Sequence, residues 1–210
     1  TDLYISNAVQ QGDASLSPEK NSAFKIGSRY RQTGFSALLS GFYTHGKDMI
    51  DWVQTTETEL TDSKYHVMNI GKLDNMGFNV DAEIYMNELL PRCFVTNIRL
   101  GYAYINQNHE TETEILKSLY ALEYLRHKAV FGLDHKIWSK LSASWSVRWQ
   151  QRMNGYHPYT KVDCKVMWND RKYSVYVKAD NITCHRYYDL SAVKQPGLWV
   201  MAGVSVNLGW

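Results

Sequence analysis

Residues 198–210, LWVMAGVSVNLGW, decide the fold, because apolar side chains recur at every second position along them. The apolar set is Leu198, Val200, Ala202, Val204, Val206, Leu208 and Trp210. The intervening positions end in Gly203, Ser205, Asn207 and Gly209. Successive side chains of a β-strand point to opposite faces, so residues at every second position share one face. The segment is therefore predicted to be a strand with one apolar face.

The same alternation recurs upstream. It is clear in residues 76–87, 141–150 and 173–180, and weaker in 22–31, 34–44, 94–106, 122–137 and 159–168. These segments predict nine strands and no convincing helix. The runs are about 9–15 residues long, whereas strands of soluble proteins most often have about 5–6 residues. A tilted strand needs about 9–11 residues to cross a bilayer.

The second face of these strands carries Ser, Asn, Gln, Asp, Glu, Lys and Arg. Such a face suits a wet or plugged lumen and does not suit the packed interior of a soluble β-sandwich. A soluble antiparallel β protein is the competing interpretation, and strand length together with polar inner faces argues against it. The predicted fold is all-β, an antiparallel transmembrane β-barrel.

Composition excludes several other classes. The chain has 210 residues, 44% hydrophobic and 21% charged, which excludes a disordered tail. A net charge of +2 gives no general electrostatic reason to bind nucleic acid. No stretch approaches the roughly 18 apolar residues of a transmembrane helix. Three cysteines, Cys93, Cys164 and Cys184, match neither a disulfide framework nor a metal-binding spacing.

Connection lengths alternate in the way expected of an outer-membrane barrel, which has brief periplasmic turns and longer external loops. Short joints are predicted at 32–33, 88–92, 139–140 and 169–171, and long connections at 45–66, 107–120, 154–158 and 183–197. The last strand then descends and leaves Trp210 at the periplasmic interface. Trp138 and Trp168 are expected near it as membrane-anchoring aromatic residues.

Nine strands running strictly up and down leave the first and the last strand pointing the same way, so they cannot pair antiparallel. Residues 1–20 are predicted to be the end of a preceding upward strand followed by an external loop. Residues 1–210 are therefore interpreted as the C-terminal nine to ten strands of a larger barrel. An autonomous ten-stranded barrel is the alternative.

Several motifs resemble those of the TonB-dependent outer-membrane receptors. Residues 12–20, GDASLSPEK, are similar to the family's small loop followed by Leu-x-Pro-Glu-Lys before a strand. Residues 179–183 followed by 187–189 resemble the penultimate strand and its exit, and 195–197 before a strand ending at Trp210 resemble the closing strand. Segments 124–128, 145–152 and 199–203 look most like the branch of vitamin B12 (cobalamin) receptors. Ile182-Thr183 and Leu198 depart from the family, where Leu-Phe and Arg are frequent.

The resemblance implies a barrel of about 22 strands with a plug in its lumen. Residues 1–210 would be the C-terminal part of this one barrel domain, and the N-terminal plug with its TonB-contacting segment would lie outside them. The implied function is TonB-dependent active transport of a scarce bulky ligand, cobalamin or another corrinoid, across the outer membrane of a Gram-negative bacterium. The expected partners are that ligand, TonB through the plug region, the rest of the barrel, the lipid bilayer and a surface lipoprotein.

Alternatives remain within and outside this class. A receptor of the same family for a ferric siderophore or an oligosaccharide is one, and an outer-membrane barrel hydrolase or a passive porin is another. The chain lacks G-x-S-x-G, H-E-x-x-H and G-x-G-x-x-G, so neither catalytic residues nor a cofactor are predicted.

Aromatic and His side chains on the external loops are the candidates for stacking on a flat ligand or contacting its metal centre. They are His45, Trp52, His66, His109, Tyr156, His157, His185, Tyr187 and Tyr188. No two His residues have the close spacing of a metal site, so no protein-bound metal is predicted. Charged residues predicted to face the lumen and form opposite-charge pairs are Arg126, Lys128, Arg148, Arg152, Lys161, Asp163, Lys165, Lys178 and Asp180.

Overall fold

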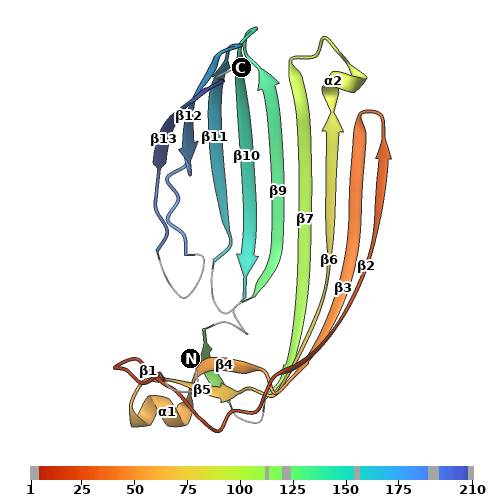
Figure 1. The fold of residues 1–210 in the computed structure, drawn as a ribbon. Helices are drawn as coiled ribbons and strands as arrows, with labels where there is room; N and C mark the ends of the chain where they lie inside the picture. Colours follow the sequence, from red (N-terminus) through yellow and green to blue (C-terminus); the bar gives the residue numbers. More distant parts are fainter. Residues whose placement is uncertain (1–4, 112–113, 120–123, 154–156, 189–193, 208–210) are drawn as a thin grey trace.

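A computed structural model describes residues 5–111, 114–119, 124–153, 157–188 and 194–207. Within these residues the largest feature is a nine-stranded antiparallel sheet, called the wall (Figure 1). Its strands are β2 (Lys20–Gln32), β3 (Phe35–Lys47), β6 (Lys72–Tyr85), β7 (Val95–Glu110), β9 (Leu125–Lys136), β10 (Leu141–Arg152), β11 (Tyr159–Asn169), β12 (Tyr173–Asp180) and β13 (Trp199–Val206). They lie side by side in chain order, and each overlaps one of the predicted segments, with bounds that differ by up to about four residues. The prediction of an all-β antiparallel fold is confirmed.

The register of the wall keeps the alternation in phase from strand to strand. Val204 pairs with Val175, and Val175 in turn pairs with Trp168. Phe131 pairs with Val147 on one side and Leu100 on the other. Directly paired side chains lie on the same face of an antiparallel sheet. The wall therefore has one continuous apolar face, called the outer face, and one largely polar face, called the inner face.

The apolar residues of the outer face are exposed to solvent. Examples are Phe24, Ile26, Leu39, Met76, Phe78, Leu100, Phe131, Val175, Val177, Val200 and Val204. Soluble monomers rarely expose a contiguous apolar surface of this extent. The outer face is thus suited to contact with hydrocarbon.

Short and long connections lie at opposite ends of the wall, as predicted (Figure 1). Thr33 and Gly34 join β2 to β3, and Gly34 has a φ of 75°, which favours glycine. Its N–H donates to Oε2 of Glu88 at 2.7 Å, next to α2 (Met86–Leu89). The end with these joints is called the short-turn end, and the opposite end is called the loop end.

At the loop end, segments from separate connections form a second, four-stranded sheet, called the loop sheet. It contains β1 (Gln10–Gln11), β5 (Tyr65–Asn69), β4 (Ile50–Thr55) and β8 (Ile115–Ser118), in that spatial order, with α1 (Thr56–Thr61) between β4 and β5. The prediction of no helix was wrong for α1 and α2. Both are too short to show a 3.6-residue period, and α1 begins with a capping box between Thr55 and Thr58.

The loop sheet has the buried core that the wall's outer face lacks. Trp52, Val53 and Val67 are buried there. The Asp51 carboxylate, also buried, accepts a hydrogen bond from the Ser118 hydroxyl and so joins β4 to β8. No helix among the described residues is long and apolar enough to cross a membrane.

Candidate functional site

The inner face of the wall contains a hollow of about 820 Å³. It lies over β2, β3, β6, β7, β9 and β10, and its charged lining comprises Lys25, Arg29, Arg31, Asp81, Glu83, Arg99 and Lys128. The lining thus carries five cationic and two acidic side chains. The hollow is suited to polar or anionic groups.

Opposite charges pair along this inner face. Both guanidinium nitrogens of Arg99 reach the Asp134 carboxylate, at 2.9 and 3.1 Å. Arg99 crosses over Gly132 to do so, since a Cβ at position 132 would lie 2.9 Å from the Arg99 Nε. Among the charged residues that were predicted to face the lumen, Lys161 pairs with Asp163 at 3.3 Å and Lys178 pairs with Asp180 at 2.9 Å.

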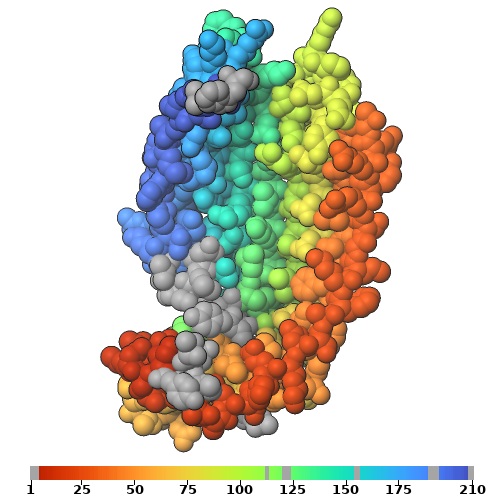
Figure 2. Space-filling view, in the orientation of Figure 1, coloured from red at the N-terminus to blue at the C-terminus, as the bar shows by residue number. Residues whose placement is uncertain are grey.

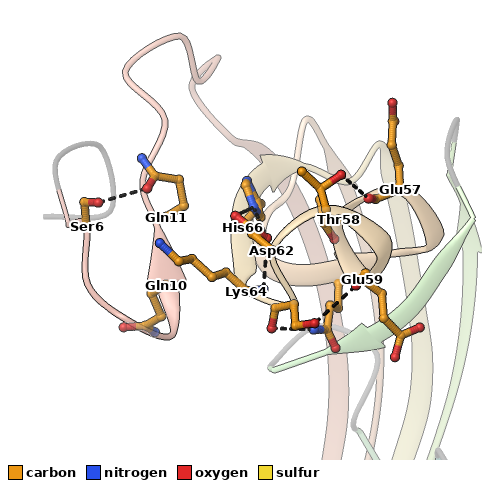
Figure 3. A network of polar contacts seen from close by, with 12 residues as sticks. Ser6, Gln10, Gln11, Glu57, Thr58, Glu59, Asp62, Lys64 and His66 are labelled. Atoms are coloured by element: carbon orange, nitrogen blue, oxygen red, sulfur yellow. Dashed lines mark hydrogen bonds and ion pairs between the residues drawn. The ribbon is translucent and has the colours of Figure 1, made fainter.

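Two predicted ligand residues, Trp52 and His66, belong to the loop sheet. Trp52 is only 5% exposed and packs in the core of that sheet. The His66 Nε2 lies 3.1 Å from an Asp62 carboxylate oxygen, in a polar network beside α1 and β1 (Figure 3). The Lys64 backbone N–H donates to Asp62 at 3.0 Å. This bond, followed by that with His66, lowers the pKa of the Asp62 carboxyl from its usual value.

His45 and His109 lie where wall strands reach the loop end. The His45 Nδ1 contacts the Asp74 carboxylate at 2.6 Å, and the Tyr43 hydroxyl donates to the same carboxylate at 3.0 Å. His45 and Tyr43 lie on the outer face, because each is an even number of positions from Leu39 along β3. His109 is exposed near the end of β7, opposite Leu73.

The structure brings two other predicted residues, His185 and Tyr187, together in the segment that follows β12. The Tyr187 ring stacks on that of Tyr159 with ring centroids 4.3 Å apart, and the His185 ring lies nearly parallel to that of Tyr159 with a centroid distance of 6.4 Å. Asn181 holds this segment, since its side-chain amide donates to the His185 carbonyl at 2.9 Å and its Oδ1 accepts from the His185 N–H at 3.1 Å. The result is an aromatic stack at the loop end.

Tyr159 and Asn181 were not predicted as site residues. Asn181 directly follows β12 and has a φ of 53°, a conformation that Asn tolerates better than most residues. An Asn at the end of an alternating run is therefore the signal that marks such a chain reversal. Tyr159 gave no signal, because its partners Tyr187 and His185 are distant in sequence.

The remaining predicted residues are scattered. Tyr188 and His157 are exposed at the loop end, whereas Tyr156 lies outside the described residues. Among the predicted anchors, Trp138 is exposed in the turn between β9 and β10, and Trp168 is exposed on the outer face at the short-turn end. Trp210 lies outside the described residues. No group of three potential metal ligands occurs in the part of the chain that the structure describes.

A family model described as TonB dependent receptor-like, beta-barrel, matches residues 1–182. The fold is also similar to solved structures. They include a "Copper transporter OprC" with a TM-score of 0.70 and 15% identity, over 92% of this chain and 32% of that one. The FrpB iron transporter from Neisseria meningitidis (F3-3 variant) has a TM-score of 0.67 and 16% identity, over 93% and 31%.

A third similar structure is the siderophore receptor PirA from Pseudomonas aeruginosa, with a TM-score of 0.63 and 16% identity, over 94% of this chain and 31% of that one. The chain thus spans about a third of the length of each of these proteins. At such identities the likeness concerns the fold alone.

Proposed function

Since the chain belongs to the TonB-dependent receptor-like β-barrel family, we propose that it forms part of the wall of an outer-membrane transporter in a Gram-negative bacterium. The transporter takes up a scarce, bulky ligand and is driven through TonB. The observation that carries this proposal is the division of the wall into an exposed apolar face and a charged face with a hollow of about 820 Å³. Lipid requires the first face, and a polar passage or plug requires the second.

The proposed ligand is cobalamin or another corrinoid. Support comes from the resemblance of segments 124–128, 145–152 and 199–203 to the vitamin B12 receptor branch. A ferric siderophore is the second candidate, because the similar structures include an iron transporter and a siderophore receptor. Both ligand classes hold a metal ion inside an organic frame, so the aromatic and imidazole side chains at the loop end suit either.

Binding to the complete receptor decides between these ligands. Calorimetric titration with cobalamin, a ferric siderophore and an oligosaccharide is expected to give a cobalamin Kd at least about 100-fold below the other two, a difference of about 2.7 kcal/mol. Tighter binding of the siderophore would replace the corrinoid proposal. Uptake of radiolabelled ligand that persists in cells lacking TonB would contradict energised transport and favour a porin.

The aromatic stack is the part of the loop end on which this ligand proposal is tested. His185→Ala is expected to weaken cobalamin binding about tenfold, about 1.4 kcal/mol, by removing an imidazole beside Tyr159. Tyr173→Ala is the matched control, because Tyr173 begins β12 at the short-turn end. Equal effects of the two variants would contradict a ligand site at the stack. Lipid or peptide hydrolysis by the purified receptor would favour the hydrolase alternative.

The proposed partners follow from the same family membership. TonB engages a plug region that precedes this part of the barrel, and the remaining strands of the barrel complete the wall. A surface lipoprotein is proposed at the loop end. Pull-down from membranes with the complete receptor, with and without ligand, measures both associations, and the absence of TonB from the captured material would contradict the first.

A further inference from the structure

The outer face of the wall contains an apolar hollow of about 410 Å³ over β6, β7, β9 and β10. The side chains that shape it include Val80, Leu100, Tyr102, Ala129, Phe131 and Trp149. Each of these four strands is paired on both sides within the wall. The hollow therefore belongs to the continuous sheet and does not arise from an open edge.

Ala129 forms the floor of this hollow. It pairs with Tyr102 on β7 and with Trp149 on β10, so its methyl group lies between two large rings across the sheet. His127 precedes Ala129 and Phe131 follows it on the same face of β9, because side chains alternate along a strand. Because the methyl group of Ala129 is much smaller than these rings, it leaves a hollow in the outer face, called the cup.

The rim of the cup nearest the loop end is polar. The Tyr102 hydroxyl and the His127 Nδ1 are hydrogen-bonded at 2.8 Å. The His127 ring lies 5.0 Å from that of Tyr104 and 6.1 Å from that of Trp149. The rim is therefore an aromatic cluster with hydrogen-bonding atoms, a composition typical of the membrane interface.

The position of the cup along the strands agrees with that of an interface. Trp149 pairs with Thr160, whereas Trp168 lies at the other end of the same strand, β11. From Thr160 to Trp168 the chain rises about 27 Å, or about 20 Å in height for a strand tilted by about 40°. This approaches the roughly 25 Å apolar band between the aromatic girdles of membrane barrels. The cup lies just inside the girdle at the loop end.

We propose that the cup centred on Ala129 holds one acyl chain of a membrane lipid from the leaflet at the loop end, with His127 and Tyr102 beside the ester groups. The proposal rests on the proposed function only in that the outer face lies in a membrane. The lining favours a hydrocarbon chain, because it carries no charged side chain and the surface it exposes is almost entirely apolar. A chain surrounded by rings gains dispersion contacts that a flat β-surface does not provide.

Fluorescence quenching by brominated acyl chains tests this proposal in the complete receptor. The receptor is reconstituted in vesicles of phosphatidylethanolamine and phosphatidylglycerol with brominated chains. The signal of Trp149 is obtained as the difference between the receptor and its Trp149→Phe variant, and that of Trp168 in the same way. Ala129→Leu fills the cup and is expected to reduce quenching of Trp149 at least about twofold, because the chain loses contact with the ring.

Two further variants keep the result interpretable. Ala202→Leu is the matched control, because Ala202 is exposed on the outer face of β13, away from the cup, and its replacement is expected to leave quenching of Trp149 unchanged. Phe131→Ala removes one side of the cup and is expected to reduce quenching as Ala129→Leu does. Native mass spectrometry of receptor released in mild detergent is expected to show one lipid fewer for both variants than for Ala202→Leu.

The outcomes separate this inference from the proposed function. Quenching of Trp168 together with Trp149, unaffected by Ala129→Leu and Phe131→Ala, would overturn the acyl-chain site and leave the membrane location intact. Absence of quenching at both tryptophans would overturn the membrane location itself. If native mass spectrometry showed a bound protein in place of the lipid, the cup would be a protein interface, and this result would also overturn the proposal.

Discussion

The wall and the loop sheet are both built from antiparallel strands, but they place apolar side chains in opposite ways. Val204 in the wall is 67% exposed, whereas Val53 in the loop sheet is fully buried. The loop sheet obeys the usual rule for a protein in water, with apolar groups inside. The wall reverses it, because a lipid surrounding makes no demand that apolar groups be hidden and requires that polar groups face inward. Exposure therefore has a different meaning in each region.

Removing Trp52 tests whether the loop sheet depends on its own core. Trp52→Ala is expected to destabilise the loop sheet by about 3–5 kcal/mol through loss of buried contacts and the cavity left behind. Hydrogen exchange of the β4 and β5 amides measures it. Leu60→Ala is the control, since Leu60 in α1 is 84% exposed. Unchanged amide exchange in Trp52→Ala would show that the loop sheet does not depend on a core around Trp52. Trp52 would then remain a candidate ligand residue.

Charging the outer face tests the other side of the comparison. Val204→Arg is expected to destabilise the receptor in vesicles by about 2–4 kcal/mol, the cost of an Arg side chain facing the bilayer core. Ser205→Arg, one position away and on the inner face, is expected to change stability by no more than about 0.5 kcal/mol. Denaturant unfolding in vesicles measures both. Equal stability of the two variants would mean that the faces are not solvated differently.

Close packing is also expected within the wall. A Cβ at Gly77 would collide with the Tyr104 carbonyl oxygen and lie 2.8 Å from the Phe42 ring. Gly77→Ala is therefore expected to cost about 1–3 kcal/mol through overpacking. Gly41→Ala on the neighbouring strand is the control, because its Cβ would meet only one atom, at 3.7 Å. Thermal unfolding that fails to separate the two variants would contradict the register described for β3, β6 and β7.

The smallest expected effect concerns acid sensitivity of the loop sheet. The lowered pKa of Asp62 means that its carboxylate stabilises the folded state at pH values above the ordinary Asp pKa of about 3.9. This contribution is lost as the pH falls through the lowered pKa. Asp62→Asn is expected to reduce the acid dependence of amide exchange in β5, and Glu57→Gln on α1 is expected to preserve it. Identical acid profiles for Asp62→Asn and the parent protein would contradict the role of this carboxylate.

Much of the wall could be predicted from the sequence because its signal is local. A strand with different surroundings on its two faces shows a period of two, and each of the nine predicted segments overlaps one wall strand. The alternation of short and long connections was likewise visible. The loop sheet was not, since its pairings join distant segments, as when Val53 pairs with Ser118 and Gln10 with Tyr65.

The candidate site was predicted less well for the same reason. Residue type and loop position identified His185 and Tyr187, which the structure brings to one aromatic stack with Tyr159. They did not distinguish Trp52, which is buried in the loop sheet, or His45, which is engaged by Asp74 on the outer face. Nor did they reveal the cup around Ala129. Each of these features depends on partners that lie far away in the chain.

The sequence by itself determined which side chains share a face, where strands begin and turn, and that the two faces meet different surroundings. It could do so because the pleat of a strand repeats every two residues, whatever the strand packs against. Only the tertiary structure decided how connections combine into the loop sheet, which aromatic residues stack, and which small residue becomes the floor of a cup. These features depend on register between strands, and register places residues from distant parts of the chain side by side.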